Sequence, residues 1–330
     1  MQWSKILVRA TNWVGDGVMS LPALRAIRGR FGEARIVLLA RPGVADLYRR
    51  EGCCDEVLVG TGDLRAERFD AAILLPNAFE AAWVVWRAGI PRRIGYARDH
   101  RSLLLTDAIA VPKKGQIPLH QRFYYLELLR RAGLLSELPA ADSIQLDRTE
   151  EARRNGERTF SEMGFSGPVI GLSPGAQNSR AKQWPPERFV EAAGRLASVL
   201  GASVAIFGSE KERLLGKWIA EGIRRAGQRV LNLAGETSLG RFIELTAACR
   251  VFLTNDSGAM HVAAASGVAT VAIFGPTIEA ETGPVSALAR VVREEVECSR
   301  CMLRDCPTDH RCMTRVSAER VAQVALELVK

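Results

Sequence analysis

No apolar run in the 330 residues is long enough to cross a bilayer, which takes about 20 consecutive apolar residues in a helix. The opening residues, MQWSKILVRA, also lack the long apolar core and the small-residue cleavage site of a signal peptide. We therefore expect a cytoplasmic protein without a transmembrane segment. Low-complexity stretches and short-period repeats are absent too, and a content of 47% hydrophobic and 25% charged residues is that of a globular chain.

Two common nucleotide-binding signatures are also missing. The turn after the first expected strand contains no G-x-G-x-x-G, and the loop at residues 174–185 lacks the spacing of a Walker motif. Recognised nucleic-acid-binding modules are absent as well. The net charge of +8 and the pI of about 9.4 nevertheless favour an anionic partner, such as nucleic acid, acidic lipid or a phosphorylated sugar.

Short buried strands alternate with helical segments along most of the chain, which predicts α/β structure with parallel sheets covered on both faces. Strands are expected at residues 5–10, 36–40, 57–59, 71–75, 169–173, 203–207, 230–233, 251–254 and 270–274. Helices are expected at residues 20–30, 186–200, 211–226, 239–248, 259–266 and 317–329. The polar segment at residues 147–168 interrupts the alternation, so we expect two doubly wound domains, residues 1–155 and 156–330.

In doubly wound sheets ligands bind beyond the carboxyl ends of the strands, so the turns after the strands are the candidate sites. The first such turn places Asp16 between Gly15 and Gly17, where flexible backbone can expose the carboxylate. The alternative is a turn aspartate that bonds its own backbone. We expect the helix that follows to have Pro22 in its first turn.

Two turns in the second half carry charged side chains. The loop at residues 174–185 places Arg180 and Lys182 before a helix, which suits a phosphate-bearing ligand unless these are only surface cations. After the strand at 203–207, a glutamate can bind ribose hydroxyls or complement a helix dipole. The second role is favoured for Glu210.

We interpret the chain as organised around TNDSGAMHVAAA at residues 254–265, a strand end followed by a tight turn and a helix start. Free backbone N–H groups and the helix dipole make such a start an anion site, and Gly258 lets a ligand approach closely. The alternative is an ordinary helix cap by Asp256 or Ser257. His261 follows four residues after Ser257, on the same helix face.

Together these segments resemble the ADP-heptose:lipopolysaccharide heptosyltransferases of glycosyltransferase family 9, most of all the heptosyltransferase II type. The similarity covers nearly the whole chain to about Arg293, in the right order and spacing. It is carried by WVGDGVMSLPALRAI, LLPNAFEAA, GIPRRIGY, GLSPGAQNSRAKQWPPERF, FGSEKE, NLAGETSL and TNDSGAMHVAAASG. The resemblance implies the GT-B fold, with two Rossmann-like domains that bind the acceptor and the nucleotide sugar respectively.

The resemblance also implies roles for individual residues. Asp16 matches the catalytic base, Lys182 the lysine that contacts the donor phosphates, and Glu212 a glutamate that reaches the adenosine ribose. The donor turn D-[ST]-G-x-x-H matches Asp256, Ser257, Gly258 and His261. Further donor positions fall at Thr237 and at Gln177 and Asn178, where the loop departs from the hydroxyl-rich version of the heptosyltransferase I type.

The implied reaction transfers heptose from ADP-heptose, with inversion, to a lipid A–Kdo–heptose acceptor at the cytoplasmic face of the inner membrane. No cofactor is required, although Mg²⁺ would help to screen the donor. Candidate acceptor contacts are Arg92, Arg93, Arg98 and Arg101, whose alternative is a solvated basic face. Rival functions are the heptosyltransferase I or III type, a GT-B sugar-nucleotide epimerase and a basic nucleic-acid-binding protein.

Four cysteines fall in ECSRCMLRDCPTDHRCM near the end of the chain, with His310 among them. Cys298 and Cys301 form a C-x₂-C pair and Cys306 and Cys312 follow, which are the ligand types of a structural zinc site at an irregular spacing. The alternatives are packed thiols or disulfides, and a cytoplasmic location disfavours disulfides. This segment is remote in sequence from the candidate donor residues. Because some members of the family that the chain resembles lack such a cluster, we expect catalysis not to depend on it.

Overall fold

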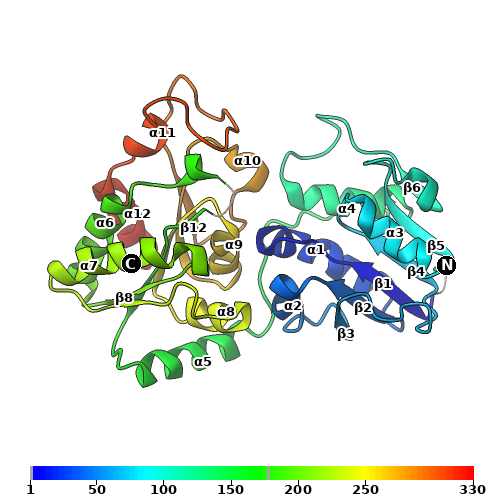
Figure 1. Ribbon diagram of the computed structural model, residues 1–330, viewed down its shortest axis with the longest axis horizontal. Coiled ribbons are helices and arrows are strands. Elements are labelled where there is room, and N and C mark those ends of the chain that lie inside the picture. The colour runs from blue at the N-terminus through cyan, green and yellow to red at the C-terminus, as the bar shows by residue number, and fades with distance from the viewer. Residues whose placement is uncertain (1–2, 177–178) are drawn as a thin grey trace. The chain divides into compact units, whose positions relative to one another are not determined.

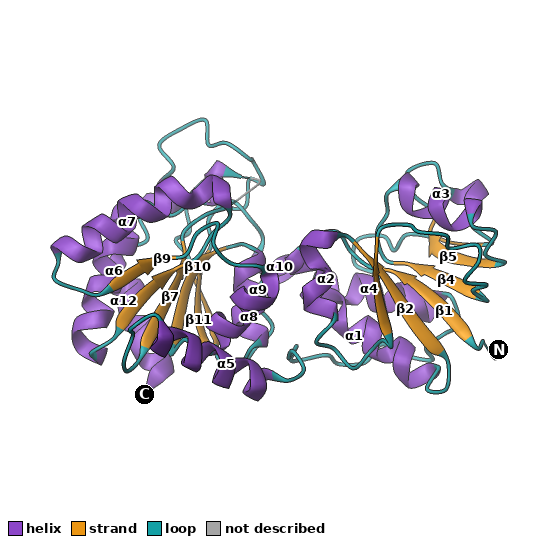
Figure 2. Ribbon diagram, turned by 60° about the horizontal axis from the view of Figure 1, so that its bottom comes forward, coloured by secondary structure: helices purple, strands orange, loops and turns teal. Residues whose placement is uncertain are grey.

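The computed structural model describes residues 3–176 and 179–330, and the chain divides into two compact units, Met1–Asp147 and Arg148–Lys330. Each unit is built on a six-stranded parallel sheet with helices packed against it (Figures 1 and 2). The expected α/β architecture with two doubly wound sheets is therefore confirmed.

The first unit has the strand order β3-β2-β1-β4-β5-β6, and every pair of neighbours is parallel. Its strands are β1 (Lys5–Arg9), β2 (Arg35–Ala40), β3 (Glu56–Val59), β4 (Ala71–Leu74), β5 (Arg92–Tyr96) and β6 (Asp107–Ile109). Its helices are α1 (Val14–Arg30), α2 (Pro42–Tyr48), α3 (Phe79–Arg87), the 3-10 turn η1 (Ser102–Leu104) and α4 (Gln121–Arg131).

The second unit repeats this order as β12-β11-β10-β7-β8-β9, again with parallel neighbours. Its strands are β7 (Val169–Ser173), β8 (Ser203–Ile206), β9 (Val230–Asn232), β10 (Val251–Asn255), β11 (Ala269–Ile273) and β12 (Ala289–Val292). Its helices and turns are α5 (Thr149–Glu162), η2 (Arg180–Lys182), α6 (Pro186–Leu200), η3 (Glu210–Glu212), α7 (Arg213–Arg225), α8 (Leu239–Ala247), α9 (Gly258–Ala265), α10 (Glu279–Thr282), α11 (Arg311–Thr314) and α12 (Ala318–Val329).

The central strands are continuous apolar runs because helices cover both faces of each sheet, so neither side of a strand meets water. All five residues of β7 and of β10 are buried, for example. In both units the chain reverses its direction of winding beside the first strand of the sheet, between β1 and β4 and between β7 and β10. Such switch points open a crevice at the carboxyl ends of the strands, where ligands of this architecture bind.

The first helix differs from the expected one. It begins at Val14, so Asp16 lies in its first turn and Pro22 lies inside it. A carboxylate is stabilised in that first turn by the helix dipole. Gly17 does not supply an unusual backbone angle; a Cβ there would lie 2.7 Å from Leu47 Cδ2 and 3.1 Å from Tyr48 Oη, so this glycine is needed for close packing with α2.

The units divide after Asp147, whereas the sequence placed the division after residue 155. The reason is that α5 belongs wholly to the second unit, where it packs against α8. A Cβ on Gly156 would lie 2.1 Å from the carbonyl oxygen of Glu244, and Asn155 Nδ2 donates to Glu244 Oε1 over 3.1 Å. A division at 155 would cut through this helix pair.

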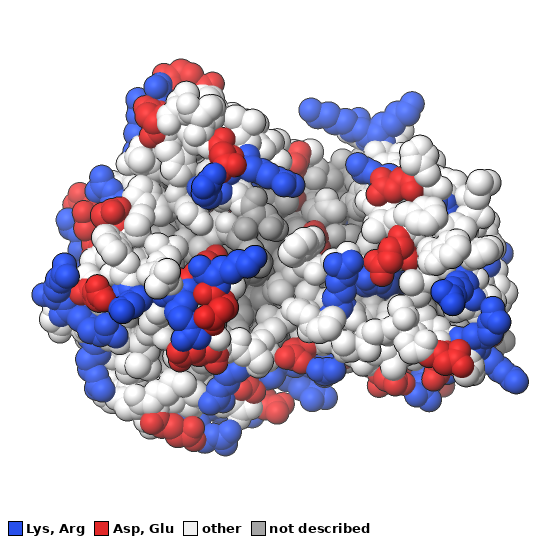
Figure 3. Space-filling model, in the orientation of Figure 1, with Lys and Arg blue, Asp and Glu red and all other residues white. Residues whose placement is uncertain are grey.

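Three strands, β5, β6 and β12, were not expected; β6 and β12 lie at sheet edges and β5 lies beside β6. Each contains or adjoins charged residues and is only partly buried, so it lacks the apolar run that marks the central strands. Of the helices in the described part of the chain, none is long and apolar enough to pass through a membrane. Basic and acidic side chains are interspersed over the face drawn in Figure 3.

Candidate functional site

The switch point of the second unit is held in shape by Asn255, the last residue of β10. Its side chain is fully buried, its Nδ2 donates to the carbonyl of Pro174 over 2.6 Å, and its Oδ1 accepts from the amide of Trp184 over 3.0 Å. The turn after β10 is thereby tied to both ends of the loop at 174–185. Because a buried amide with satisfied partners has little freedom, this frame is rigid.

Lys182 and Asp256 meet across this frame as an ion pair of 2.7 Å. The Asp256 carboxylate is almost fully buried and also accepts a hydrogen bond of 2.8 Å from the Thr277 hydroxyl. The Lys182 ammonium is more exposed and has three N–H donors, so Asp256 orients it while leaving donors available for an anion. The structure thus brings together two residues that lie far apart in the sequence.

Among the described residues, no side chain caps the N-terminus of α9. Ser257 occupies the cap position, but its hydroxyl lies 3.2 Å from that of Thr254 and makes no cap hydrogen bond, while Asp256 faces Lys182. The ordinary-cap interpretation is therefore wrong. The first backbone N–H groups of α9 remain without a side-chain cap and, with Gly258 first in the helix, suit an anion. His261 is buried on the same helix.

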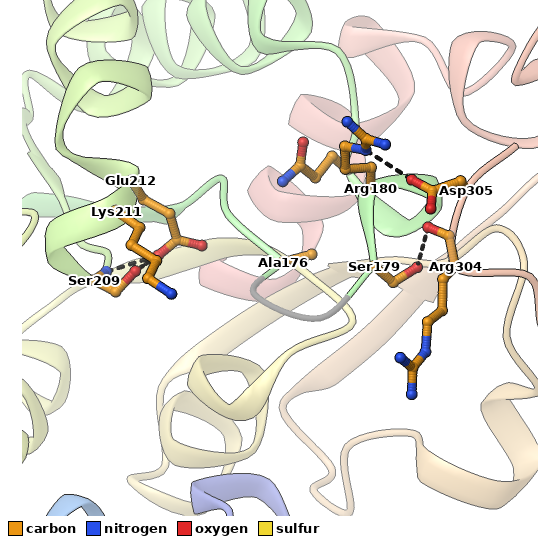
Figure 4. Close-up of a pocket in the computed structure, with 9 residues that line it drawn as sticks. Ala176, Ser179, Arg180, Ser209, Lys211, Glu212, Arg304 and Asp305 are labelled. Carbon is orange, nitrogen blue, oxygen red and sulfur yellow. Dashed lines mark hydrogen bonds and ion pairs between the residues drawn. The ribbon is translucent and has the colours of Figure 1, made fainter.

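Beside this frame, between the turns that follow β7 and β8, lies a pocket of about 480 Å³. Figure 4 shows Lys211 and Glu212 on one side of Ala176, and Arg304 and Asp305 on the other. The pocket is lined by Ala176, Ser179, Arg180, Gln183, Ser209, Lys211, Glu212, Arg304 and Asp305. Its volume suits a small molecule, and its polar lining includes side chains of both charges.

Glu212 is held rigidly at the pocket. Its Oε2 accepts from the amide of Ser209 over 2.7 Å and from the Ser209 hydroxyl over 2.8 Å, as part of a capping box at the start of η3. The carboxylate lies directly against Gly175, where a Cβ would be only 1.7 Å from Oε1. Glu210, by contrast, is exposed and pairs with Arg213. Of the two glutamates, only Glu212 lines the pocket.

In the first unit, Asp16 lies at the corresponding switch point, after β1. Its Oδ1 accepts a hydrogen bond of 3.2 Å from the Tyr125 hydroxyl. Burial raises the pKa of Asp16 above its ordinary value, and the Tyr125 hydrogen bond partly offsets that effect. A carboxylate with a raised pKa binds a proton more readily, which is a property of a general base.

Comparison with known proteins assigns the family. The model of glycosyltransferase family 9 (heptosyltransferase) matches residues 61–311. The chain is 34% identical to lipopolysaccharide heptosyltransferase 2 of Escherichia coli K12 and equally to that of Salmonella typhimurium LT2, over 88% of each chain. The chain belongs to glycosyltransferase family 9. The prediction that it is a glycosyltransferase is confirmed.

A solved structure agrees with this assignment. ADP-heptose lipopolysaccharide heptosyltransferase II of E. coli superposes with a TM-score of 0.84 at 32% identity, over 98% of each chain. The expected GT-B class, with two Rossmann-like units, is therefore confirmed.

The cysteine-rich segment packs directly against the pocket of this family 9 chain, which sequence distance did not suggest. The carbonyl of Arg304 accepts from the Ala181 amide over 3.0 Å and from the Ser179 hydroxyl over 3.1 Å. His310 Nε2 lies 2.7 Å from the Ala181 carbonyl, and Arg180 pairs with Asp305 at 2.7 Å. The segment therefore braces the turn that carries Lys182, and the expectation that catalysis does not depend on it stays a prediction.

All four cysteines of the segment are free thiols, from the exposed Cys298 and Cys301 to the buried Cys312. Burial is the main cause that raises the pKa of Cys312 to about 11, and the charges of the other three cysteines add to it. Within residues 3–176 and 179–330, no three His, Cys, Asp or Glu side chains lie close enough together to hold a metal ion.

The four candidate acceptor arginines have different environments. Arg101 is fully buried and donates to the carbonyls of Tyr96 and Pro76, so its role in this structure is to hold the unit together. Arg92 pairs with Asp107 over 2.6 Å, and Arg93 donates to the Leu104 carbonyl. Arg98 is well exposed, 3.8 Å from Asp99. Among the four, Arg98 is thus the one best placed to meet a ligand.

Three predicted donor positions remain. Thr237 is half-buried and directly precedes Ser238, the residue that caps α8. Gln177 and Asn178 lie outside the described residues. The residues of the pocket that sequence reasoning missed are Ala176, Ser179, Gln183, Ser209, Lys211, Arg304 and Asp305. Ser209 and Lys211 lie in the turn after β8, which the sequence had marked as a candidate site, whereas nothing in the cysteine-rich segment indicated Arg304 and Asp305.

Replacing Gly175 by alanine is expected to destabilise the protein by about 1–3 kcal/mol, because the new methyl group must displace the Glu212 carboxylate. Urea unfolding measures the loss. Gly194→Ala in α6 is the control, since nothing lies within 4 Å of its Cβ position and alanine favours a helix. Equal stability of Gly175→Ala and the wild type would show that Glu212 is not packed as described.

Proposed function

We propose that this protein transfers heptose from ADP-L-glycero-D-manno-heptose to the heptosyl-Kdo inner core of lipopolysaccharide and adds the second heptose. The observation that carries the proposal is the Lys182–Asp256 pair beside the uncapped start of α9, next to a pocket that fits a small molecule. A cation and a helix N-terminus at one switch point suit the diphosphate of a nucleotide sugar. The names of the relatives at 34% identity support heptose as the transferred sugar and lipopolysaccharide as the molecule that receives it.

In this proposal the second unit binds ADP-heptose. Lys182 and the first amides of α9 bind the diphosphate, and Glu212 binds the ribose hydroxyls from its fixed position against Gly175. During transfer the bond between the anomeric carbon and the phosphate oxygen breaks, and its electron pair leaves with ADP. The developing charge is stabilised by these prearranged donors, which is an efficient way to lower such a barrier.

The first unit supplies the base. Asp16 accepts the proton of the attacking acceptor hydroxyl while that oxygen forms its bond to the anomeric carbon on the face opposite ADP, so the configuration inverts. The hydroxyl of Tyr125 holds the carboxylate in place. Lys182 and the α9 amides supply the positive charge at the diphosphate, so we propose that no metal is required and that Mg²⁺ only stimulates. Activity in excess EDTA would test this.

Arg304→Gln is expected to weaken ADP binding about 10- to 100-fold, the range for a lost charge-assisted hydrogen bond. The backbone of Arg304 is tied to η2, its side chain lines the pocket, and in the described part of the chain no carboxylate pairs with its guanidinium. Calorimetric titration with ADP measures the effect. Arg315→Gln, an exposed arginine off the pocket, is the control; equal affinities of all three proteins would remove Arg304 from the site.

Mass spectrometry of the purified protein with ADP-heptose and lipid A–Kdo acceptors tests the function itself. The acceptors carry zero, one or two heptoses, and we expect one heptose to be added to the acceptor that already has one. Transfer only to the heptose-free acceptor, or only to the acceptor with two, would indicate the type I or type III reaction instead. Conversion of ADP-heptose without any acceptor would indicate an epimerase.

A further inference from the structure

Helix α3 carries its largest apolar side chains on the side that faces solvent. Phe79, Trp83 and Trp86 are 46%, 42% and 44% exposed. The residues that α3 buries against the sheet are small, namely Ala81, Ala82 and Val85. α3 lies across the sheet from α1, α2 and α4 (Figure 2). A helix that served only the core would show the reverse pattern, with its aromatic rings inside.

The exposed rings form one continuous surface. They follow at spacings of four and three residues, so they share one side of the helix. The ring centroids of Phe79 and Trp83 are 6.3 Å apart, and those of Trp83 and Trp86 are 5.1 Å apart. Leu103, 94% exposed, lies on η1, which contacts α3. We refer to Phe79, Trp83, Trp86 and Leu103 as the aromatic face.

The charges beside the aromatic face are positive. Arg87 ends α3, and the guanidinium of Arg65 donates to the Arg87 carbonyl over 3.1 Å. Neither guanidinium has a carboxylate partner among the residues the structure describes. The acidic residue of α3, Glu80, is paired with Arg41 at 3.3 Å. The helix therefore presents aromatic rings next to two uncompensated cations.

We propose that the aromatic face docks the first unit on an anionic lipid bilayer. Tryptophan rings have an apolar body and a polar N–H, which suits the boundary between headgroups and acyl chains. Cations within a Debye length of an anionic surface add attraction. The inference rests on the proposed function in one respect: an acceptor anchored in lipid gives the protein a reason to bind a membrane.

Sedimentation with vesicles tests the inference on the full chain. Vesicles of phosphatidylethanolamine and phosphatidylglycerol should carry the wild type down, and phosphatidylcholine vesicles should carry down less. The double variant Trp83→Ser/Trp86→Ser should bind the anionic vesicles at least about tenfold more weakly, because two large apolar surfaces are lost. Arg65→Gln/Arg87→Gln should weaken binding mainly at low salt.

Trp218→Ser is the matched control, since Trp218 is 47% exposed on α7 in the second unit. Leu103→Ser provides a second probe that leaves α3 intact if the double variant does not fold. The inference is overturned if the wild type ignores anionic vesicles, or if the well-folded aromatic-face variants bind like the wild type. It is also overturned if Trp218→Ser loses as much binding, or if the variants change only the association of protein copies.

The transferase assay separates this inference from the proposed function. With a water-soluble acceptor that lacks acyl chains, the aromatic-face variants should retain wild-type turnover, and with acceptor in vesicles they should lose it in proportion to binding. Vesicle binding without any heptose transfer would leave the docking surface standing and overturn the acceptor assignment. Transfer to both acceptors without vesicle binding would support the acceptor assignment and overturn the docking surface.

Discussion

Asp16→Asn is expected to lower kcat by about 100- to 10,000-fold, the contribution typical of a general base. Asparagine has nearly the same size and can still accept the hydrogen bond from Tyr125, but it cannot take up the proton of the acceptor at neutral pH. Steady-state kinetics with ADP-heptose and the single-heptose acceptor measure the loss. Affinity for ADP should not change, because Lys182 and Asp256 lie in the other unit.

The pH dependence gives a second test of Asp16. Because burial raises its pKa, the wild-type rate should fall with acidity at a pH above the ordinary pKa of an aspartate, and this limb should vanish in Asp16→Asn. The protonated carboxyl contributes stability that is present below the unfolded-state pKa and is lost as the pH rises through the raised folded-state pKa. At neutral pH, Asp16→Asn should therefore not unfold more easily than the wild type.

Two outcomes would contradict the assignment of Asp16 as the base. One is nearly full turnover in Asp16→Asn. The other is a loss of activity explained entirely by weaker ADP binding, since the carboxylate would then support the fold rather than take a proton. In either case Asp16 would return to the role of an acidic residue in the first turn of α1, where it complements the helix dipole.

Lys182→Ala is expected to lower kcat/KM for ADP-heptose by about 100- to 1,000-fold, because a prearranged donor at the departing diphosphate is lost. Of the partners of the buried Asp256 carboxylate within residues 3–176 and 179–330, the variant leaves only the Thr277 hydroxyl. We expect a cost of about 1–3 kcal/mol in stability from this unpaired group. The circular dichroism spectrum should nevertheless match that of the wild type.

The double variant Lys182→Ala/Asp256→Asn separates catalysis from stability. Asparagine removes the unpaired charge, so the melting temperature should recover while activity stays low. If the melting temperature and the activity both recovered, Lys182 would act only by neutralising Asp256. Wild-type donor kinetics in Lys182→Ala would remove the lysine from the mechanism altogether.

The parallel sheets were predictable because their central strands are buried on both faces. The strands β7 and β10 are buried throughout and begin as apolar runs, and polar residues from Ser173 and Thr254 onward follow where the strands end. Polar residues directly after such a strand lie at the ligand-binding edge of the sheet. For the same reason Asp16, which follows β1, was identified as a candidate.

The strands β5, β6 and β12, and residues that pack across long sequence distances, were not predictable in this way. Arg101 looked like a surface cation because arginine is mostly exposed, yet its guanidinium is buried against backbone carbonyls. The start of α1 was missed because Gly15 and Gly17 read as turn residues, whereas Gly17 is required by the neighbouring Tyr48. Contacts of this kind leave no periodic pattern in the sequence.

The sequence by itself determined the two doubly wound sheets, the turns in which the site lies and the family motifs, because each is set by local burial patterns or by short runs of residues. Only the tertiary structure decided that Lys182 pairs with Asp256, that α9 has no side-chain cap, and that Arg304 and His310 brace the turn at η2. Those contacts join residues separated by more than seventy positions along the chain. They exist because parallel strands bring the segments after β7, β10 and β12 to one edge of the sheet.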